Sequence, residues 1–338
     1  MKGMVLAAGL GTRFRPVTDT IPKPLVPLCN QPLAGWVVDS LIAAGADEVV
    51  VNLHHHPAKL RAWLDARYKG SCTIRYSDEP VILGTGGGLR KVRRYFEREE
   101  IFLLVNGDSV QFPPWNALIG SLRTSGAIAA MLLRHPPRDD RFTSVWVDGH
   151  RVTSIGAAGC GEPLMFSGVH ALTPDVFECL PDRDVSGMTE DFYRPMLERG
   201  EREIVGVVHD GLWFDVGSPR RYSQASRELT AAIARGEVRA PAGSHAGAGA
   251  SVVADSARID GTISMAVAGE CSVIEGGAIV ADSALWEHAV VGANARVEGS
   301  IVGNGVHVAA GAVVRNALLW GRDVIPVDPD LPCVVTEL

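Results

Sequence analysis

Short apolar runs alternate with longer amphipathic stretches over the first 235 residues of the chain. Runs with the length and composition of buried strands cover residues 3–8, 48–53, 72–76, 101–106 and 127–133. Stretches with helical spacing lie between them, at residues 33–44, 57–68 and 87–96. This alternation predicts an α/β fold with a mostly parallel sheet, whose ligands bind beyond the carboxyl ends of the strands.

The pattern changes its period after residue 236. Residues 236–250 are small and nearly uncharged, which predicts a linker. Beyond them a large apolar residue recurs every six positions. These residues are Val253 and Ile259, then Val267, Val273, Ile279, Leu285, Val291 and Val297, and after a slip of one Val302, Val308 and Val314. Small side chains follow most of them four positions later, at Ala257, Gly277, Ser283, Ala289, Ala295 and Ala312.

A six-residue period of one large and one small side chain suits short strands that coil around a three-sided prism. The segment resembles the left-handed parallel β-helix of hexapeptide-repeat proteins, with about three coils expected. We therefore predict an α/β domain over residues 1–235, a linker over 236–250, a β-helix over 251–321 and a tail over 322–338. Open coil ends and the apolar residues Leu318, Leu319 and Trp320 predict contacts between subunits of a homo-oligomer.

Composition narrows the class of protein. The chain has 338 residues, 46% of them apolar, and a net charge of -7. It shows no apolar run long enough to span a bilayer, no signal-peptide pattern and no CxxC pair, so we expect a cytoplasmic protein without a membrane partner. Only five of its 32 basic residues are lysines, and none follows Lys91. The chain lacks the broad basic surface that nucleic-acid binding needs, so an anion would bind at a local site.

The richest candidate for such a site follows the first predicted strand. Gly9, Gly11, Thr12 and Arg13 form a loop there, and Lys23 stands between two prolines. Glycines allow backbone N–H groups to approach phosphate oxygens closely, and the two cations supply compensating charge. The segment does not have the P-loop pattern.

Five motifs in order give the chain a resemblance to the sugar-1-phosphate nucleotidylyltransferases. They are Ala7-Ala8-Gly9-x-Gly11-Thr12-Arg13 with Pro22-Lys23-Pro24-Leu25, Glu79-Pro80 with Gly84-Thr85-Gly86-Gly87-Gly88, Asn106-Gly107-Asp108, Phe166-Ser167-Gly168, and Trp213-Phe214-Asp215-Val216-Gly217. The match covers residues 1 to about 225. The β-helix tail extends it to members such as mannose-1-phosphate guanylyltransferases.

The resemblance implies a Rossmann-like nucleotidyltransferase domain with a mixed, mostly parallel sheet. It also implies the reaction: an NTP, GTP or UTP, and a sugar 1-phosphate give an NDP-sugar and pyrophosphate. The sugar phosphate oxygen attacks the α-phosphorus as pyrophosphate leaves, so catalysis depends on positioning two anions and neutralising their charge. Asp108 and Asp215 match the family's two Mg²⁺ ligands.

The same resemblance assigns the remaining site residues. Arg13 faces the leaving pyrophosphate, and Lys23 stabilises charge at the α-phosphate. Nucleotide contacts fall to Leu6, Ala7, Ala8, Gly9, Gly11, Thr12, Glu79, Gly84, Thr85 and Gly86. Contacts to the sugar phosphate fall to Asn106, Glu162, Ser167 and Gly168.

One departure from the family pattern concerns charge. Many relatives carry Glu-Lys-Pro before the sugar-binding strand, where this chain reads Gly161-Glu162-Pro163. We expect Mg²⁺ to replace the missing lysine, with a secondary contribution from Arg220 or Arg221.

The base and the sugar stay open at this point. The sequence from Lys23 to Asn30 and the hexapeptide tail favour mannose-1-phosphate guanylyl transfer. Glu162-Pro163 and the run of glycines at 86–88 instead favour uridylyl transfer to an amino-sugar 1-phosphate, of N-acetylmuramate or N-acetylglucosamine type. Two further alternatives are an acyltransferase activity in the tail, which would use His245, His288 or His307, and a non-catalytic nucleotide-sugar sensor.

Overall fold

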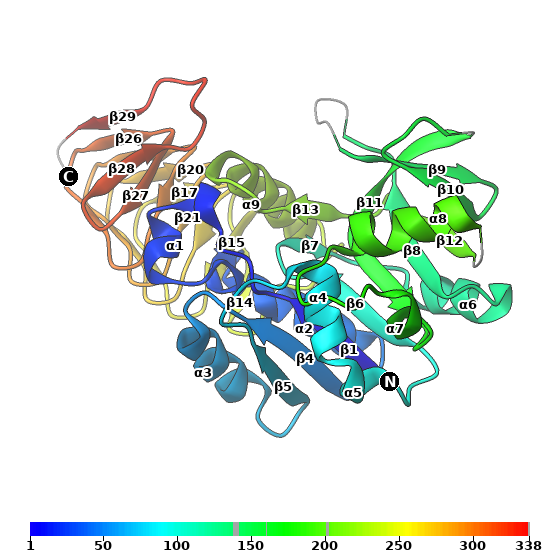
Figure 1. Cartoon of the computed structure of the whole chain (residues 1–338). Coiled ribbons are helices and arrows are strands. Elements are labelled where there is room, and N and C mark those ends of the chain that lie inside the picture. Colours follow the sequence, from blue (N-terminus) through cyan, green and yellow to red (C-terminus); the bar gives the residue numbers. More distant parts are fainter. Residues whose placement is uncertain (138–141, 160, 201–202, 337–338) are drawn as a thin grey trace. The chain divides into compact units, whose positions relative to one another are not determined.

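The computed structural model describes residues 1–137, 142–159, 161–200 and 203–336, which form two compact units (Figure 1). Unit 1 comprises Met1–Leu10 and Ala34–Trp213, and unit 2 comprises Gly11–Leu33 and Phe214–Leu338. These boundaries differ from the predicted domain over residues 1–235. The segment that carries Arg13 and Lys23 belongs to the same compact unit as the C-terminal repeats.

A nine-stranded sheet in the order β5-β4-β1-β6-β11-β8-β12-β10-β9 forms the centre of unit 1. The strands are β1 (Lys2–Leu6), β4 (Glu48–Leu53), β5 (Thr73–Asp78), β6 (Phe102–Asn106), β8 (Ala129–Arg134), β9 (Ser144–Asp148), β10 (Arg151–Ile155), β11 (Glu162–Leu172) and β12 (Ile204–Val208). The first four in chain order are parallel, whereas β11 runs antiparallel to both β6 and β8. The predicted α/β fold with a mixed sheet is confirmed, although β5 is a half-exposed edge strand and not the buried strand expected at 72–76.

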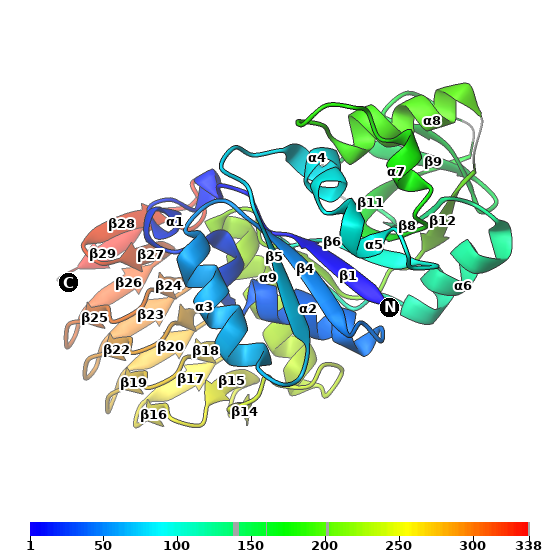
Figure 2. The ribbon, with the colours of Figure 1, turned by 60° about the horizontal axis from the view of Figure 1, so that its bottom comes forward.

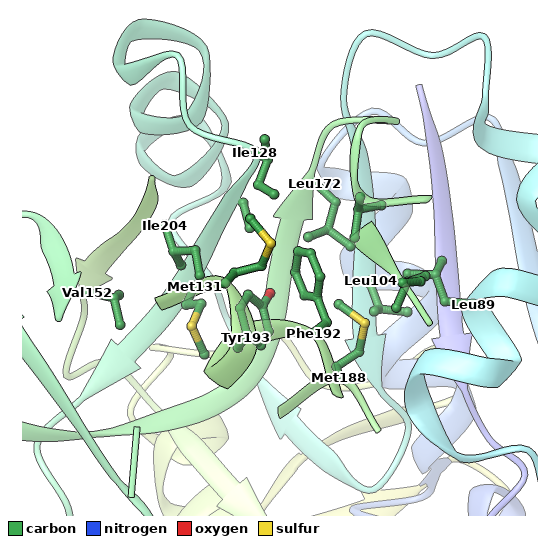
Figure 3. Close-up of a cluster of buried hydrophobic side chains, with 14 of the residues drawn as sticks. Leu89, Leu104, Ile128, Met131, Val152, Leu172, Met188, Phe192, Tyr193 and Ile204 are labelled. Atoms are coloured by element: carbon green, nitrogen blue, oxygen red, sulfur yellow. The ribbon is translucent and has the colours of Figure 1, made fainter. Parts of the chain in front are cut away.

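Helices cover both faces of this sheet. They are α2 (Leu33–Ala43), α3 (Pro57–Tyr68), α4 (Gly84–Lys91), α5 (Arg93–Phe96), α6 (Trp115–Ser125), α7 (Val176–Cys179), η3 (Thr189–Tyr193) and α8 (Arg194–Arg199). On one face, Leu89 of α4 and Phe192 of η3 join the main buried cluster with Leu104 of β6 (Figure 3). On the other face, α2 packs so closely on β1 that a Cβ at Gly3 would lie 2.9 Å from Leu41. No helix in the described part of the chain combines the length and apolar character needed to cross a bilayer.

Unit 2 contains the repeats, whose short strands stack in three parallel sheets (Figure 2). The first sheet holds β15 (Ser251–Ala254), β18 (Val267–Ala268), β21 (Ala284–Leu285), β24 (Ile301–Val302) and β27 (Ala317–Trp320). The second holds β16 (Arg258–Ile259), β19 (Val273–Ile274), β22 (Val290–Val291) and β25 (His307–Val308). The third holds β17 (Thr262–Ser264), β20 (Ile279–Ala281), β23 (Arg296–Glu298) and β26 (Val313–Arg315). This arrangement agrees with the predicted hexapeptide β-helix; its left-handed sense stays a prediction.

The coil length differs from the prediction. Beyond the first coil, partners in register lie 17 positions apart, as Ala284 does from Val267 and Ile301 from Ala284. The inward side chains therefore follow steps of six, six and five residues, and the slip predicted once after Val297 recurs in every coil. The inward residues are Ile263, Ala268, Ile274, Val280, Leu285, Val291, Val297, Val302, Val308, Val314 and Leu319.

Three predicted inward anchors are consequently wrong by one position. Val267, Val273 and Ile279 each precede the residue that enters the buried cluster. The second sheet has four stacked strands, so three coils was an underestimate.

Antiparallel strands cover ends of the β-helix that we expected to be open. β14 (Ser244–Gly247) pairs with β15, so these residues of the predicted linker form a strand. At the other end β28 (Asp323–Pro326) pairs with β27, and β29 (Val334–Thr336) pairs with β26. Leu318 and Leu319 are each only 1% exposed, so they belong to the interior of unit 2 and are not available for subunit contacts.

Segment 11–33 and a long helix complete unit 2. The segment contains η1 (Thr12–Phe14), α1 (Val17–Thr20), η2 (Lys23–Leu25) and a two-stranded ribbon of β2 (Pro27–Leu28) and β3 (Gln31–Pro32). The helix is α9 (Pro219–Ala234), which begins after Ser218 as N-cap. The thiol of Cys29 lies 3.3 Å from the hydroxyl of Thr230 on α9, and burial raises the pKa of this thiol to about 12. It is therefore a neutral packing group that joins the segment to the helix.

Candidate active site

In unit 1 the loop after β1 is held by two buried polar side chains. The Ala7 N–H donates to Asn52 Oδ1 at 2.6 Å, and Asn52 Nδ2 donates to Glu79 Oε1 at 2.8 Å. The other oxygen of Glu79 accepts from the Leu83 N–H at 3.1 Å. Glu79 is only 2% exposed, and together with Asn52 its carboxylate links the carboxyl ends of β1, β4 and β5. Its direct contact with a base stays a prediction.

The glycines at 84–88 pack against a neighbouring loop of unit 1. The N–H groups of Gly86 and Gly87 donate to the Ser186 carbonyl at 2.9 and 3.1 Å. A Cβ at Gly87 would lie 2.0 Å from the Asp184 carbonyl, and Thr85 Oγ1 accepts from a backbone N–H at 2.8 Å. These residues therefore fix the start of α4, and their predicted nucleotide contacts are untested.

Asn106 is the last residue of β6, and Asp108 follows it at the carboxyl edge of the sheet. The Gly107 N–H donates to the Leu6 carbonyl at 2.9 Å, which keeps the ends of β6 and β1 together. A Cβ at Gly168, which has a φ of 92°, would lie 2.8 Å from the Asn106 amide nitrogen. Unit 1 thus brings Asn106 and Gly168 into contact, as their common assignment to the sugar phosphate requires, and it leaves Asp108 exposed.

Ser167 has a buried hydroxyl that can form a hydrogen bond with a ligand. Its carbonyl accepts from Gln111 Nε2 at 2.9 Å and from Trp213 Nε1 at 3.3 Å, which fixes the backbone. Its Oγ makes no hydrogen bond within the described part of the chain, although the residue is only 5% exposed. Because an unsatisfied buried hydroxyl is costly, a ligand hydroxyl or phosphate oxygen is a natural partner.

A histidine missed by the sequence reasoning holds Glu162. His135 lies just after β8, with Nε2 at 3.0 Å from Glu162 Oε1 and Nδ1 at 2.6 Å from Asp210 Oδ2. Hydrogen bonds to Asp210 and then to Glu162 raise the pKa of His135. Burial disfavours the ionised form of Asp210, yet the hydrogen bonds from His135 lower the pKa of its carboxyl overall.

In unit 2 the loop of Arg13 and Lys23 is compact. Gly11 has a φ of 63°, and a Cβ there would lie 2.9 Å from Thr18 and 3.0 Å from Lys23. The Phe14 N–H and the Thr18 hydroxyl both donate to the Gly11 carbonyl, at 2.9 Å each. Lys23 is 8% exposed, whereas Arg13 is exposed. Glycine is needed at position 11 because its positive φ and the close approach of Thr18 and Lys23 leave no room for a side chain.

Asp215 lies at the end of β13 (Trp213–Asp215) with two guanidinium groups near it. Arg221 forms an ion pair with Oδ2 of Asp215. A Cβ at Gly217 would lie 2.9 Å from Arg13 Nη2 and 3.0 Å from Asp215 Oδ1, so Gly217 permits this close approach. Arg220 points elsewhere, to Asp328 and Asp330 in the C-terminal segment at 3.3 and 3.1 Å. Of the two arginines proposed to replace the missing lysine, only Arg221 pairs with Asp215.

The donor chemistry fits magnesium. Asp108 of unit 1 and Asp215 of unit 2 offer carboxylate oxygens, the hard ligands that Mg²⁺ prefers. No group of three or more His, Cys, Asp or Glu side chains gathers within the described ranges, so either carboxylate would need substrate phosphates and water to complete the coordination of a Mg²⁺ ion.

Asn52 and His135 could not be identified from local sequence. Asn52 is the one polar residue within the apolar run Val49–Leu53, which indicates a buried polar side chain with a special role. Its role could not be predicted, because its partners Ala7 and Glu79 follow other strands. His135 gives no signal at all, because its partners lie 27 and 75 positions away.

Two family models match the chain. A model described as nucleotidyl transferase matches residues 2–232, and one described as GlmU-like, C-terminal hexapeptide matches residues 238–328. The two matches meet near the predicted boundary at 235, so sequence families divide the chain differently from its compact units.

Curated relatives include both guanylyl- and uridylyltransferases. An N-acetylmuramate α-1-phosphate uridylyltransferase of Neisseria meningitidis serogroup B is 34% identical over 67% of this chain and 96% of its own length. A UTP–glucose-1-phosphate uridylyltransferase of Synechocystis is 26% identical over 95% of this chain and 88% of its own. A probable mannose-1-phosphate guanylyltransferase 2 of Oryza sativa subsp. japonica is 28% identical over 96% of this chain and 87% of its own.

A solved structure supports the fold. The crystal structure of HddC from Yersinia pseudotuberculosis aligns with a TM-score of 0.57 at 23% identity, and the alignment covers 68% of this chain and 99% of that one.

Proposed function

Because the chain belongs to the nucleotidyl transferase family, we propose that it is an enzyme that transfers the nucleotidyl group of an NTP to a sugar 1-phosphate. A phosphate oxygen of the sugar 1-phosphate forms the new bond to the α-phosphorus. The bond from the α-phosphorus to the bridging oxygen breaks, and pyrophosphate leaves with that electron pair. The observation that carries the proposal lies in unit 2, where Lys23 packs against the Gly11 turn and Arg13 lies beside Gly217 and Asp215.

The cations of unit 2 neutralise the charge that develops during transfer. We assign the exposed guanidinium of Arg13 to the departing pyrophosphate and the buried ammonium of Lys23 to the α-phosphate. Preorganised charges of this kind supply most of the rate enhancement in phosphoryl transfer, because the protein forms no covalent bond itself. Arg221 contributes by holding Asp215 and takes over part of the task of the missing lysine.

The groups of unit 1 orient the two substrates. The backbone from Leu6 to Gly9, together with Gly84, Thr85 and Gly86, is assigned to the nucleotide. Ser167 Oγ donates to the sugar 1-phosphate, and Glu162 accepts from a sugar hydroxyl, with His135 fixing its orientation. Asn106 and Gly168 border the same subsite.

Asp108 and Asp215 are the proposed magnesium ligands. When bound, Mg²⁺ supplies positive charge to the phosphate oxygens and orients them. Asp215 keeps Arg221 in place in either case, because its carboxylate is the counter-charge of that guanidinium.

For the base and sugar we propose mannose-1-phosphate guanylyl transfer, supported by the sequence from Lys23 to Asn30. Coverage of the tail does not distinguish the bases, because a guanylyltransferase matches 96% of this chain and a uridylyltransferase 95%. Uridylyl transfer to an amino-sugar 1-phosphate is the second candidate, favoured by the 34% identity to the Neisseria uridylyltransferase. We propose a homo-oligomer in the cytoplasm, with contacts other than the buried Leu318 and Leu319.

The test is pyrophosphate release by the full chain, with four NTPs against mannose, glucose, N-acetylglucosamine and N-acetylmuramate 1-phosphates, with and without Mg²⁺. We expect release with GTP and mannose 1-phosphate. Turnover confined to UTP would replace the guanylyl proposal by the uridylyl one, and no release with any pair would support a nucleotide-sugar sensor. Acetyl-CoA added to the same reactions tests an acyltransferase activity of the tail, which we do not expect.

A further inference from the structure

A line of buried aromatic side chains runs through unit 2 from the β-helix to the loop of Arg13. Trp320 contacts Trp286 edge to face at 5.7 Å between ring centroids, Trp286 contacts Tyr222 at 5.9 Å, and Tyr222 contacts Phe14 at 5.7 Å. Trp286, Tyr222 and Phe14 are each at most 2% exposed. Edge-to-face contacts of this type favour one mutual orientation of the two rings. A displacement of one ring therefore displaces the next ring in the line.

A hydrogen bond fixes the middle of this line. Trp286 Nε1 donates to the hydroxyl oxygen of Tyr222 at 2.8 Å, within the protein interior. Burial raises the pKa of Tyr222 far above its ordinary value, so the hydroxyl stays neutral. Breaking this bond leaves an unsatisfied polar group in an apolar site, which favours movement of the ring.

Phe14 connects this line of aromatic side chains to Arg13. The two residues are neighbours in η1, and the Phe14 N–H donates to the Gly11 carbonyl. A shift of the Phe14 ring therefore moves the backbone from which the Arg13 guanidinium extends. Arg13 in turn lies beside Gly217 and Asp215.

A second contact joins the same segment to the β-helix. Asn30 Nδ2 donates to the Ala268 carbonyl of β18 at 3.0 Å and to the Ser244 hydroxyl of β14 at 3.2 Å. Asn30 has a φ of 66°, a conformation that asparagine tolerates better than most residues. Segment 11–33 is thus linked to the β-helix directly at Asn30 and through Tyr222 of α9 at Phe14.

We propose that the β-helix is a positioning element of the active site: Trp286, through Tyr222 and Phe14, holds Arg13 where it meets the leaving pyrophosphate. The inference rests on the proposed function for the role of Arg13. A displacement of about 1 Å in a catalytic group can cost on the order of 100-fold in rate, so a contact between buried rings is sufficient to control turnover. Trp286 is a positioning residue, because it acts through its neighbours.

The kinetic test uses Trp286→Phe and Tyr222→Phe in the full chain. Each removes one partner of the hydrogen bond and keeps a ring in place. We expect kcat to fall about tenfold with KM for the NTP nearly unchanged. Trp115→Phe is the matched control, because Trp115 Nε1 also donates to a hydroxyl, Ser40 Oγ at 3.3 Å, but lies in unit 1. It should leave kcat unchanged.

A second background separates positioning from general stability. In an Arg13→Ala protein, Trp286→Phe should cause no further loss of kcat, because the group through which it acts is gone. Equal losses in both backgrounds, or an unchanged kcat in the original one, would overturn the proposal. Should Trp286→Phe fail to fold, Tyr222→Phe decides by the same comparison.

Hydrogen exchange measured by mass spectrometry tests, without any substrate, whether Trp286 and Tyr222 hold the backbone around Arg13. Peptides covering Thr12–Phe14 should exchange faster in Trp286→Phe and Tyr222→Phe than in the unaltered protein or Trp115→Phe. Equal exchange in all four would overturn the positioning role. Absence of pyrophosphate release by the unaltered protein would instead refute the proposed function, and the exchange result distinguishes the two failures.

Discussion

The two compact units hold their site residues in different ways. Unit 1 places neutral and acidic groups at strand ends and fixes them with buried hydrogen bonds, as Asn52 does for Ala7 and Glu79. Unit 2 places Arg13, Lys23 and Arg221 around one glycine turn and one carboxylate, and it supports them through the β-helix. We propose that the two units have different roles. Unit 1 selects and orients the substrates, and unit 2 neutralises the charge that develops on the phosphates during nucleotidyl transfer.

The β-helix is a separate module by sequence but not by structure. As a sequence feature it is a separate C-terminal module, matched by its own family model. In the structure it shares a compact unit with the segment of Arg13 and Lys23. Unit 2 therefore combines the cations to which we assign catalysis with the β-helix. If the assignment holds, variants in unit 2 should affect kcat, whereas variants in unit 1 should affect KM.

The largest expected effect is the loss of Lys23. Lys23→Met should lower kcat by about 100- to 1,000-fold, the usual cost of removing one group that stabilises transition-state charge. The measurement is pyrophosphate release at saturating NTP and sugar 1-phosphate. Lys69→Met, which alters an exposed lysine of unit 1, is the control and should be unaffected. A kcat for Lys23→Met within a few-fold of the control would remove Lys23 from the catalytic set.

Asp215→Asn should have the next largest effect. The amide lacks the charge that pairs with Arg221, and it is a poorer magnesium ligand. We expect kcat to fall about 100-fold and the Mg²⁺ concentration for half-maximal activity to rise about tenfold. A Mg²⁺ titration of the rate measures both, with the exposed Asp323→Asn as control. Unchanged turnover and unchanged Mg²⁺ dependence would contradict the assignment.

Ser167→Ala probes the selecting role of unit 1. Loss of one ligand hydrogen bond is worth about 1.5 kcal/mol, so KM for the sugar 1-phosphate should rise about tenfold while kcat stays nearly constant. Ser77→Ala provides a close control, because its buried hydroxyl also makes no hydrogen bond among the described residues. The comparison between units fails if Ser167→Ala lowers kcat and leaves KM unaltered.

The smallest effect concerns pH. The pKa of His135 is raised in the folded protein, so its contribution to stability is fully present below the ordinary value of 6.5 and is lost as pH rises through the raised value. The difference in urea midpoint between the unaltered protein and His135→Asn should therefore shrink from pH 6 to pH 9. His307→Asn, an exposed position in the β-helix, should show no such trend. A constant difference would show that His135 and Glu162 are not coupled by charge.

Sequence patterns predicted what depends on neighbours along the chain. Strand β4 and helix α3 were found with their observed bounds, because an apolar run and a Pro57 start are local signals. The β-helix register was missed where two apolar residues are adjacent, as in Val273–Ile274. Only strand pairing decides which member faces inward.

Prediction of the site residues has the same limit, because motifs do not reveal contacts between distant segments. Arg13, Lys23 and Asp215 were named from motifs; unit 2 places Arg13 and Asp215 beside Gly217 and Lys23 beside Gly11, and their roles stay predictions. The motifs gave no hint that Trp286 would contact Tyr222, because 64 residues separate them. Contacts between distant segments depend on packing, which a single sequence does not display.

The most direct test of the account is the stoichiometry of the reaction in the full chain with Mg²⁺. NDP-sugar and pyrophosphate should appear in equal amounts, and only when an NTP and a sugar 1-phosphate are both present. Pyrophosphate release without the sugar 1-phosphate, or no NDP-sugar with any NTP, would contradict nucleotidyl transfer by this protein.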